Sequence, residues 1–157
     1  MYKRQDIEIP EVCIEEAQAV YDEGFFVEHR FGNGGHGGWK SASIHSFVEK
    51  GKDLNMGWFH TKNPEGHGLR EDQVDWGWTE IAEVCPETKR WLEDFPHKSY
   101  RRLRFMLLEP GASIDAHNDA SPQRVREGRI RNIAGAINIA FYQPDNCYLR
   151  RADTKEE

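Results

Sequence analysis

A histidine and an aspartate two residues apart, His117 and Asp119, are the side chains whose types and spacing most clearly allow chemistry. On an extended segment, residues i and i+2 project to the same side, so both could reach one metal ion. Two histidines and one carboxylate bind one face of octahedral Fe(II) and leave three positions for a co-substrate and oxygen. The spacing therefore makes His117 and Asp119 candidate metal ligands and catalytic residues. A chance pair on the surface is the alternative.

The segment that follows offers groups that could bind an anion. Four arginines lie within eight positions: Arg124, Arg126, Arg129 and Arg131. Guanidinium groups pair with carboxylates through two parallel hydrogen bonds, so Arg131, the nearest to the next predicted strand, is predicted to bind a co-substrate. Asn138 is a second predicted co-substrate residue, because a buried amide needs partners. The alternatives are a solvated arginine loop and an ordinary core hydrogen bond.

Helices and strands that could position these residues alternate along the chain. Pro10 and Gly24 bracket a predicted helix, because proline suits a first turn and glycine a helix end. Strands are predicted over 25–30 and 39–48, and the stretch 51–78 is predicted to be a loop rich in glycine and aromatic residues. Thr79 is predicted to cap a helix over 80–85, and Pro86 to open the next helix.

Strands dominate the second part of the sequence. From Tyr100 onward the pattern predicts a strand, in which Leu103, Phe105 and Leu107 face one way while Arg102, Arg104 and Met106 face the other. The stretch 109–112 (Glu-Pro-Gly-Ala) predicts a turn. Further strands are predicted over 113–117 and 133–142, the second ending in a turn at 143–146.

The composition limits the class of protein. The chain has 157 residues and a formal net charge of −6, which fits one domain over 1–157 and disfavours non-specific nucleic-acid binding. No apolar run is long enough to span a membrane, and the N-terminus lacks a secretory signal, so we predict a cytoplasmic protein with no membrane partner. Three widely spaced cysteines argue against a disulfide framework.

The segment Arg102–Asp119 resembles the R-x-x-R-L-x-P-G-x-x-I-x-x-H-x-D stretch of the aspartyl/asparaginyl β-hydroxylase family. Residues 79–86, 137–140 and 144–147 resemble the flanking helix, strand and turn of that family. Trp39–His45 is similar to its upstream strand, which lines the co-substrate pocket. The likeness covers roughly residues 38–150 and is dense from 79 to 150.

The resemblance implies a fold, an activity and cofactors. The family consists of Fe(II)- and 2-oxoglutarate-dependent dioxygenases, cupin-like enzymes built on a double-stranded β-helix, or jelly roll. The expected fold is therefore α+β, a jelly roll with an N-terminal helix and flanking helices. His117 and Asp119 would hold Fe(II), and Arg131, Asn138 and His45 would bind the co-substrate 2-oxoglutarate. The substrate would be an amino acid, a peptide side chain or a small acid.

The sequence also departs from the family pattern. The family takes a third ligand, a histidine, and a co-substrate arginine from later strands, and no histidine follows His117. His45 stands where the family has a tryptophan, and Met106 where it has a serine. We therefore expect a β-helix that lacks its last strands and is inactive as this chain alone. A jelly-roll binding module without turnover is the alternative, and an open sheet edge could pair with a second copy.

Overall fold

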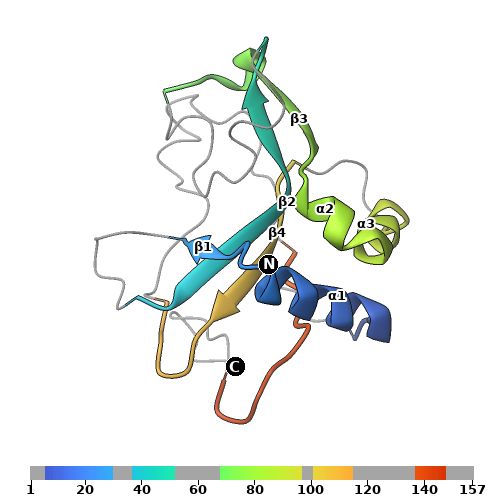
Figure 1. Ribbon diagram of the computed structural model, residues 1–157, viewed down its shortest axis with the longest axis vertical. Helices are drawn as coiled ribbons and strands as arrows, with labels where there is room; N and C mark the ends of the chain where they lie inside the picture. The colour runs from blue at the N-terminus through green and yellow to red at the C-terminus, as the bar shows by residue number, and fades with distance from the viewer. Residues whose placement is uncertain (1–5, 30–36, 52–67, 97–100, 115–136, 148–157) are drawn as a thin grey trace. The chain divides into compact units, whose positions relative to one another are not determined.

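The computed structural model describes residues 6–29, 37–51, 68–96, 101–114 and 137–147. The chain divides into two compact units, one of residues 9–114 and one of residues 1–8 and 115–157. Each unit is described by itself, so the predicted single domain stays a prediction. The helices and strands of the described residues all lie in the unit of residues 9–114 (Figure 1).

Antiparallel strands form one sheet around a long central strand. They are β1 (Val27–Glu28), β2 (Trp39–Glu49), β3 (Val74–Trp78) and β4 (Leu103–Leu108). At Lys40, β2 is paired with both β1 and β4, and at His45 it is paired with both β3 and β4. Therefore β1 and β3 flank one edge of β2 toward its two ends, and β4 flanks the other edge (Figure 1).

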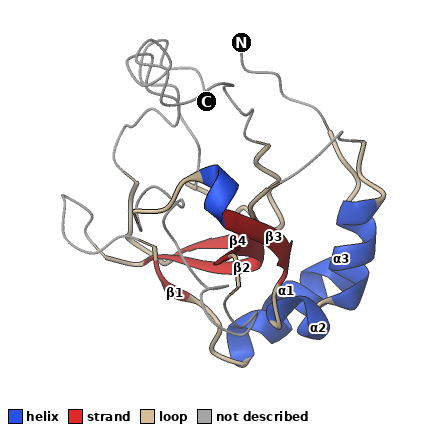
Figure 2. Ribbon diagram, turned by 90° about the horizontal axis from the view of Figure 1, so that it is seen from above, coloured by secondary structure: helices blue, strands red, loops and turns tan. Residues whose placement is uncertain are grey.

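A short 3-10 helix, η2 (Glu71–Gln73), leads into β3. The α-helices lie together beside the sheet, as both ribbon views show (Figures 1 and 2). They are α1 (Glu11–Asp22), α2 (Ile81–Val84) and α3 (Pro86–Glu93). Pro10 directly precedes α1 and Pro86 is the first residue of α3, positions where a missing N–H breaks no helical bond. Gly24 adopts a positive φ of 77° just after α1. The predicted helices at 10–24 and from Pro86 are thus confirmed, as is the α+β class, whereas the jelly roll stays a prediction.

A carboxylate from α1 joins it to the start of α3. Glu16 accepts hydrogen bonds from the backbone N–H of Glu87 at 2.9 Å and of Thr88 at 2.7 Å. The Thr88 hydroxyl donates a third bond of 2.7 Å to the same carboxylate. The first N–H groups of a helix have no partner within it, so Glu16 supplies from another helix the cap that α3 lacks locally.

The helices enclose two thiols. Cys13 and Cys85 are both fully buried and free. Burial is the main cause that raises the pKa of Cys85 to about 12, and it also raises the pKa of Cys13. Neither thiol therefore forms an appreciable amount of thiolate near neutral pH.

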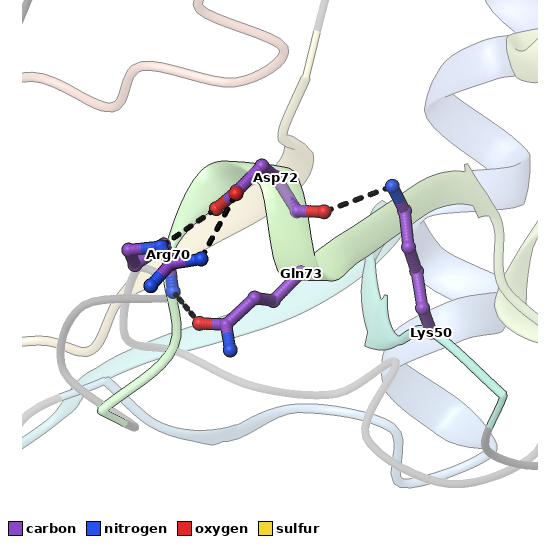
Figure 3. Close-up of polar contacts among 4 residues, drawn as sticks. All are labelled: Lys50, Arg70, Asp72 and Gln73. Carbon is purple, nitrogen blue, oxygen red and sulfur yellow. Dashed lines mark hydrogen bonds and ion pairs between the residues drawn. The ribbon is translucent and has the colours of Figure 1, made fainter.

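The strands β2 and β3 are tied together where each meets the segment between them (Figure 3). The Lys50 backbone N–H and ammonium donate to the carbonyls of Gln73 and Asp72, both at 2.9 Å. Arg70 forms two bonds to the Asp72 carboxylate, at 2.9 and 3.0 Å, and its backbone N–H donates to the Gln73 side chain at 2.8 Å. Because Arg70 and Asp72 are both exposed, this ion pair adds little to stability.

Several predicted elements differ from the structure within residues 9–114. The predicted loop over 51–78 is wrong at its end, where Val74–Trp78 forms β3. The predicted strand over 25–30 is reduced to Val27–Glu28 in its described part, and Ser113 and Ile114 are not in a strand. The strands at 39–48 and from Leu103 and the turn at 109–112 are confirmed, the turn closed by the Ala112 N–H donating to the Glu109 carbonyl at 3.0 Å.

The described residues 137–147 form no strand. The strand predicted over 133–142 is wrong for residues 137–142, where Ile137 is 63% exposed and Tyr142 is 82% exposed. An apolar alternating sequence becomes a strand only when another strand satisfies its backbone, and within 137–147 none does. The predicted turn at 143–146 is confirmed, because Asn146 has a positive φ of 66° and the Cys147 N–H donates to the Pro144 carbonyl at 3.1 Å.

Candidate functional site

Two opposite faces of the sheet differ in chemistry. Directly opposed residues of antiparallel strands point to the same side, and consecutive residues point to opposite sides. One face carries Ala42, Phe47, Phe105 and Trp78, and Lys89 from α3 lies 5.3 Å above the Trp78 ring, so this is the face toward the helices. The other face carries three buried serines, Ser41, Ser43 and Ser46, and we call it the serine face.

A bulge in β2 decides which residues reach the serine face. Ser43 is opposite Arg104 and His45 is opposite Leu103, so two residues of β2 advance against one of β4. Arg104 and Leu103 are neighbours in β4 and point to opposite sides. Ser43 therefore shares its face with Arg104, whereas His45 lies on the helix side, and the alternation then returns Ser46 to the serine face.

Thr79 holds this bulge in place. Its hydroxyl donates to the Ser43 carbonyl at 2.8 Å and contacts the Ile44 carbonyl at 3.3 Å, and its backbone N–H donates to the Ile44 carbonyl at 3.0 Å. These bonds satisfy carbonyl groups that the irregular ladder would otherwise leave unpaired. The prediction that Thr79 caps α2 is therefore wrong, because Glu80 stands at the helix start without a side-chain cap and the Thr79 hydroxyl serves the sheet.

One end of the serine face contains a buried hydrogen-bonded pair. His29 Nδ1 and Ser41 Oγ share a hydrogen bond of 3.0 Å, and both residues are buried. The His29 ring packs on the Trp39 ring, with centroids 4.3 Å apart. Ser41 thus has its polar partner within the protein.

The other two serines lack such partners. Ser43 is 2% exposed and Ser46 is 0% exposed, and within the described part of the chain neither hydroxyl has a hydrogen-bond partner. Leaving a buried hydroxyl unpaired costs about 1–3 kcal/mol. Ser43 lies directly opposite Arg104, so a guanidinium group belongs to the same face. The serine face therefore combines two buried hydroxyl groups with a guanidinium group.

The metal site predicted at His117 and Asp119 lies outside the described residues, and so does the predicted co-substrate residue Arg131. Within the described ranges no group of three or more histidine, cysteine, aspartate or glutamate side chains could hold a metal ion. The residues that can be compared with the predicted site are therefore His45 and Asn138.

His45 is buried on the helix side of the sheet. Its Nδ1–H donates to the Arg101 carbonyl, and its ring meets the Trp78 ring edge-on at 5.0 Å between centroids. Burial is the main cause that lowers the pKa of His45, against the weaker opposite effect of the bond to Arg101. A neutral, donor-bonded imidazole at this place contributes to packing between β2, β3 and β4, and it does not share a face with the serines.

Asn138 does not occupy the buried strand position that was predicted for it. It is exposed and not in a strand, so the argument that a buried amide needs a carboxylate partner no longer applies to it. Asn138 belongs to the unit of residues 1–8 and 115–157, which is described separately from the sheet.

The serines are the functional candidates that reasoning from sequence missed. Ser41 and Ser43 already show period-two spacing in a segment predicted to be a strand, which signals a polar face. Ser46 breaks this period because of the bulge, and no local sequence signal announces the extra residue. Hydroxyl and guanidinium groups, as on the serine face, are donors of the kind that an acidic co-substrate accepts from. The residues predicted to bind Fe(II) are His117 and Asp119.

Comparison with known proteins gives limited information. No family model and no solved structure matches the sequence. A protein of Escherichia phage T5 described as a "Putative replication origin binding protein" is 30% identical over 104 residues. The match covers 65% of this chain and 11% of the phage protein's length. None of the helices in the described ranges has the length and apolar content that crossing a bilayer requires.

Proposed function

We propose that this chain forms part of an Fe(II)- and 2-oxoglutarate-dependent hydroxylase, with His117 and Asp119 as metal ligands. The observation that carries the proposal is the buried serine face beside Arg104, since an apolar sheet rarely buries hydroxyl groups without a partner. The resemblance of residues 38–150 to the aspartyl/asparaginyl β-hydroxylases supports the same assignment.

The order of elements also supports the proposal. Strand β4 carries Arg104, and the turn at 109–112 follows it directly and leads toward His117 and Asp119 in the sequence. In such enzymes the iron supplies the oxidising power needed to break an unactivated C–H bond. The work of this chain would be to bind the acidic co-substrate through donors on the serine face and to exclude water. The substrate would be an amino acid, a peptide side chain or a small acid.

Conversion of 2-oxoglutarate to succinate tests this function without knowledge of the substrate. Because only two metal ligands are identified, we expect weak Fe(II) binding and slow succinate formation. Both should disappear in His117→Ala and Asp119→Ala and persist in Glu15→Ala, which alters an exposed carboxylate of α1 away from the sheet. Failure of His117→Ala to change either metal binding or turnover would contradict the proposal. Metal binding without any turnover would favour a jelly-roll binding module.

A second candidate is nucleic-acid binding, which the description of the phage T5 relative favours. The net charge of −6 opposes it, and the arginines at 124–131 are the basic segment that could serve it. Fluorescence anisotropy with labelled single- and double-stranded DNA at low and physiological salt tests this candidate. Binding that weakens steeply with salt would support it, and no binding at low salt would remove it.

A further inference from the structure

We propose that a small cavity between the turn at 109–112 and the start of β2 binds a primary ammonium group through the second carboxylate oxygen of Glu109. Such a group ends a lysine side chain and a simple alkylamine. The inference goes beyond the proposed function and does not depend on it, because no residue of the predicted metal site takes part. Nothing in the family resemblance assigns Glu109 to ligand binding.

The cavity lies where the turn after β4 meets the residues before β2. The Glu109 N–H donates to the Gly38 carbonyl at 2.9 Å, which holds the two segments together. The cavity has a volume of about 250 Å³, and its lining residues are Gly37, Gly38, Glu109, Pro110, Gly111 and Ala112. Pockets for drug-sized ligands have about 300–1,000 Å³, so this cavity suits one end group rather than a whole molecule.

Gly38 keeps the space beside the Glu109 carboxylate open. It has a positive φ of 77°, and a Cβ at this position would lie 3.2 Å from Glu109 Oε2 and 2.9 Å from the Ala112 Cβ. A larger residue would therefore occupy the space next to that oxygen. The Glu109 side chain is 39% exposed, so a ligand can reach it from solvent.

The two oxygens of the Glu109 carboxylate differ in their partners. Oε1 accepts a hydrogen bond of 2.5 Å from the Lys40 ammonium, and within the described residues this is the bond that the carboxylate makes. A carboxylate has about four acceptor positions on its two oxygens, so Oε2 can accept a second donor. Because one oxygen is already bonded, a compact ammonium group fits better than a guanidinium group, whose fork needs both oxygens.

The charges around Lys40 favour a second cation. Lys40 lies directly opposite Glu28 in the pairing of β1 with β2, so the two side chains point to the same side of the sheet. The hydrogen bond to Glu109 is the main cause that raises the pKa of Lys40, and the charge of Glu28 adds to it. Two carboxylates thus surround one ammonium group, and a bound ammonium ligand would balance the remaining negative charge.

Titration of the metal-free protein with n-butylamine near pH 7 tests the inference, followed by the backbone amide signals of Gly38 and Gly111 in ¹H–¹⁵N spectra. We expect saturable shifts with a dissociation constant of roughly 1–10 mM, as one charge-assisted hydrogen bond in an open cavity allows. Butylguanidine should bind about three- to tenfold more weakly. Tetramethylammonium carries the charge without an N–H donor and should cause no saturable shift.

A blocked lysine, Nα-acetyl-lysine N-methylamide, distinguishes the two sources of the ammonium group. Tighter binding than that of n-butylamine would assign the site to a lysine of a peptide, and equal or weaker binding would assign it to a free amine. Either result supports an ammonium site, whereas no saturable shift with either compound would overturn it.

Two variants change the carboxylate and its neighbour. Glu109→Gln keeps the size of the side chain and removes its charge, so we expect n-butylamine affinity to fall at least about tenfold. Lys40→Met leaves both Glu109 oxygens open and removes a competing cation. This variant should bind n-butylamine about three- to tenfold more tightly than wild type and should lose the preference for ammonium over guanidinium.

Glu15→Gln is the matched control, because it removes an exposed carboxylate of α1. It should bind n-butylamine as the wild type does. The Lys40–Glu109 pair is partly exposed, so neither variant should shift the thermal unfolding midpoint by more than a few degrees. Equal affinity in wild type and Glu109→Gln would overturn the site. Loss of binding in Lys40→Met, or equal shifts with tetramethylammonium and n-butylamine, would overturn it as well.

Discussion

The buried hydrogen-bonding groups of the Glu16 cap all have partners, whereas two buried hydroxyls of the serine face have none among the described residues. Glu16 is one acceptor group that receives three bonds from Glu87 and Thr88. On the serine face, Ser43 and Ser46 are donors for which the described residues supply no acceptor. The first cluster is complete within the chain and serves the fold. The second becomes complete only when something else supplies an acceptor, as expected of a binding surface.

The largest effect should come from removing the Glu16 carboxylate. Glu16→Ala takes away the cap of α3 and leaves the buried Thr88 hydroxyl without its partner, so we expect the free energy of unfolding to fall by about 2–4 kcal/mol. Urea denaturation measures this change. Glu15→Ala, on the exposed side of α1, should change it by less than about 0.5 kcal/mol. Equal effects of the two variants would show that Glu16 is no cap.

A smaller loss should follow at the bulge. Thr79→Val keeps the shape of the side chain but removes the hydroxyl that donates to the Ser43 carbonyl, and should cost about 1–2 kcal/mol. Thr79→Ser keeps the donor and should recover most of this loss in the same denaturation experiment. If Thr79→Ser is as unstable as Thr79→Val, methyl packing rather than the hydrogen bond is what stabilises the bulge.

His45 should make the free energy of unfolding depend slightly on pH. Burial lowers the folded-state pKa of His45 below the unfolded value of 6.5, so below pH 6.5 the unfolded chain binds a proton that the folded chain does not. The contribution of His45 to stability is therefore constant above pH 6.5. Below pH 6.5 it falls as the pH drops toward the folded-state pKa. The difference in unfolding free energy between wild type and His45→Asn, followed from pH 8 to 5, measures this contribution. A difference that does not change with pH would contradict it.

The smallest effect on stability should come from the serine face itself. Because Ser43 and Ser46 have unpaired buried hydroxyls, Ser43→Ala and Ser46→Ala should leave the free energy of unfolding within about 0.5 kcal/mol of wild type or raise it by up to about 1 kcal/mol. Ser41→Ala should lower it, since His29 loses its partner. A loss in Ser43→Ala as large as in Ser41→Ala would show that the Ser43 hydroxyl contributes as much stability as a paired one, and would contradict the contrast with the fully paired Glu16 cap.

The sequence correctly predicted the elements whose ends are marked by proline or glycine or whose apolar residues alternate. Proline and glycine mark the limits of α1 and the start of α3, and the apolar alternation of Leu103, Phe105 and Leu107 marks β4. Strand β3 was missed because Asp75 and Gly77 are poor strand residues by propensity. Pairing with β2 overrides that preference, and the period-two spacing of Val74, Trp76 and Trp78 was the available signal.

The bulge in β2 is the reason why the sequence did not predict which residues lie on the serine face. Counting by twos along β2 places His45 on the same face as Ser41 and Ser43, and the resemblance to the family assigns His45 to co-substrate binding. The extra residue before His45 moves its side chain to the helix side and brings Ser46 to the serine face instead. Sequence periodicity cannot locate a bulge, because the bulge depends on how two distant strands and Thr79 bond to β2.

The bulge also bears on how such a chain could change by insertion and deletion. Deleting Ile44 would remove the extra residue, so that His45 would directly follow Ser43 in a regular strand. Because consecutive residues point to opposite sides, His45 would still project to the helix side and Ser46 to the serine face. The bulge thus lets β2 gain or lose one residue at position 44 while every later side chain of the strand keeps its face.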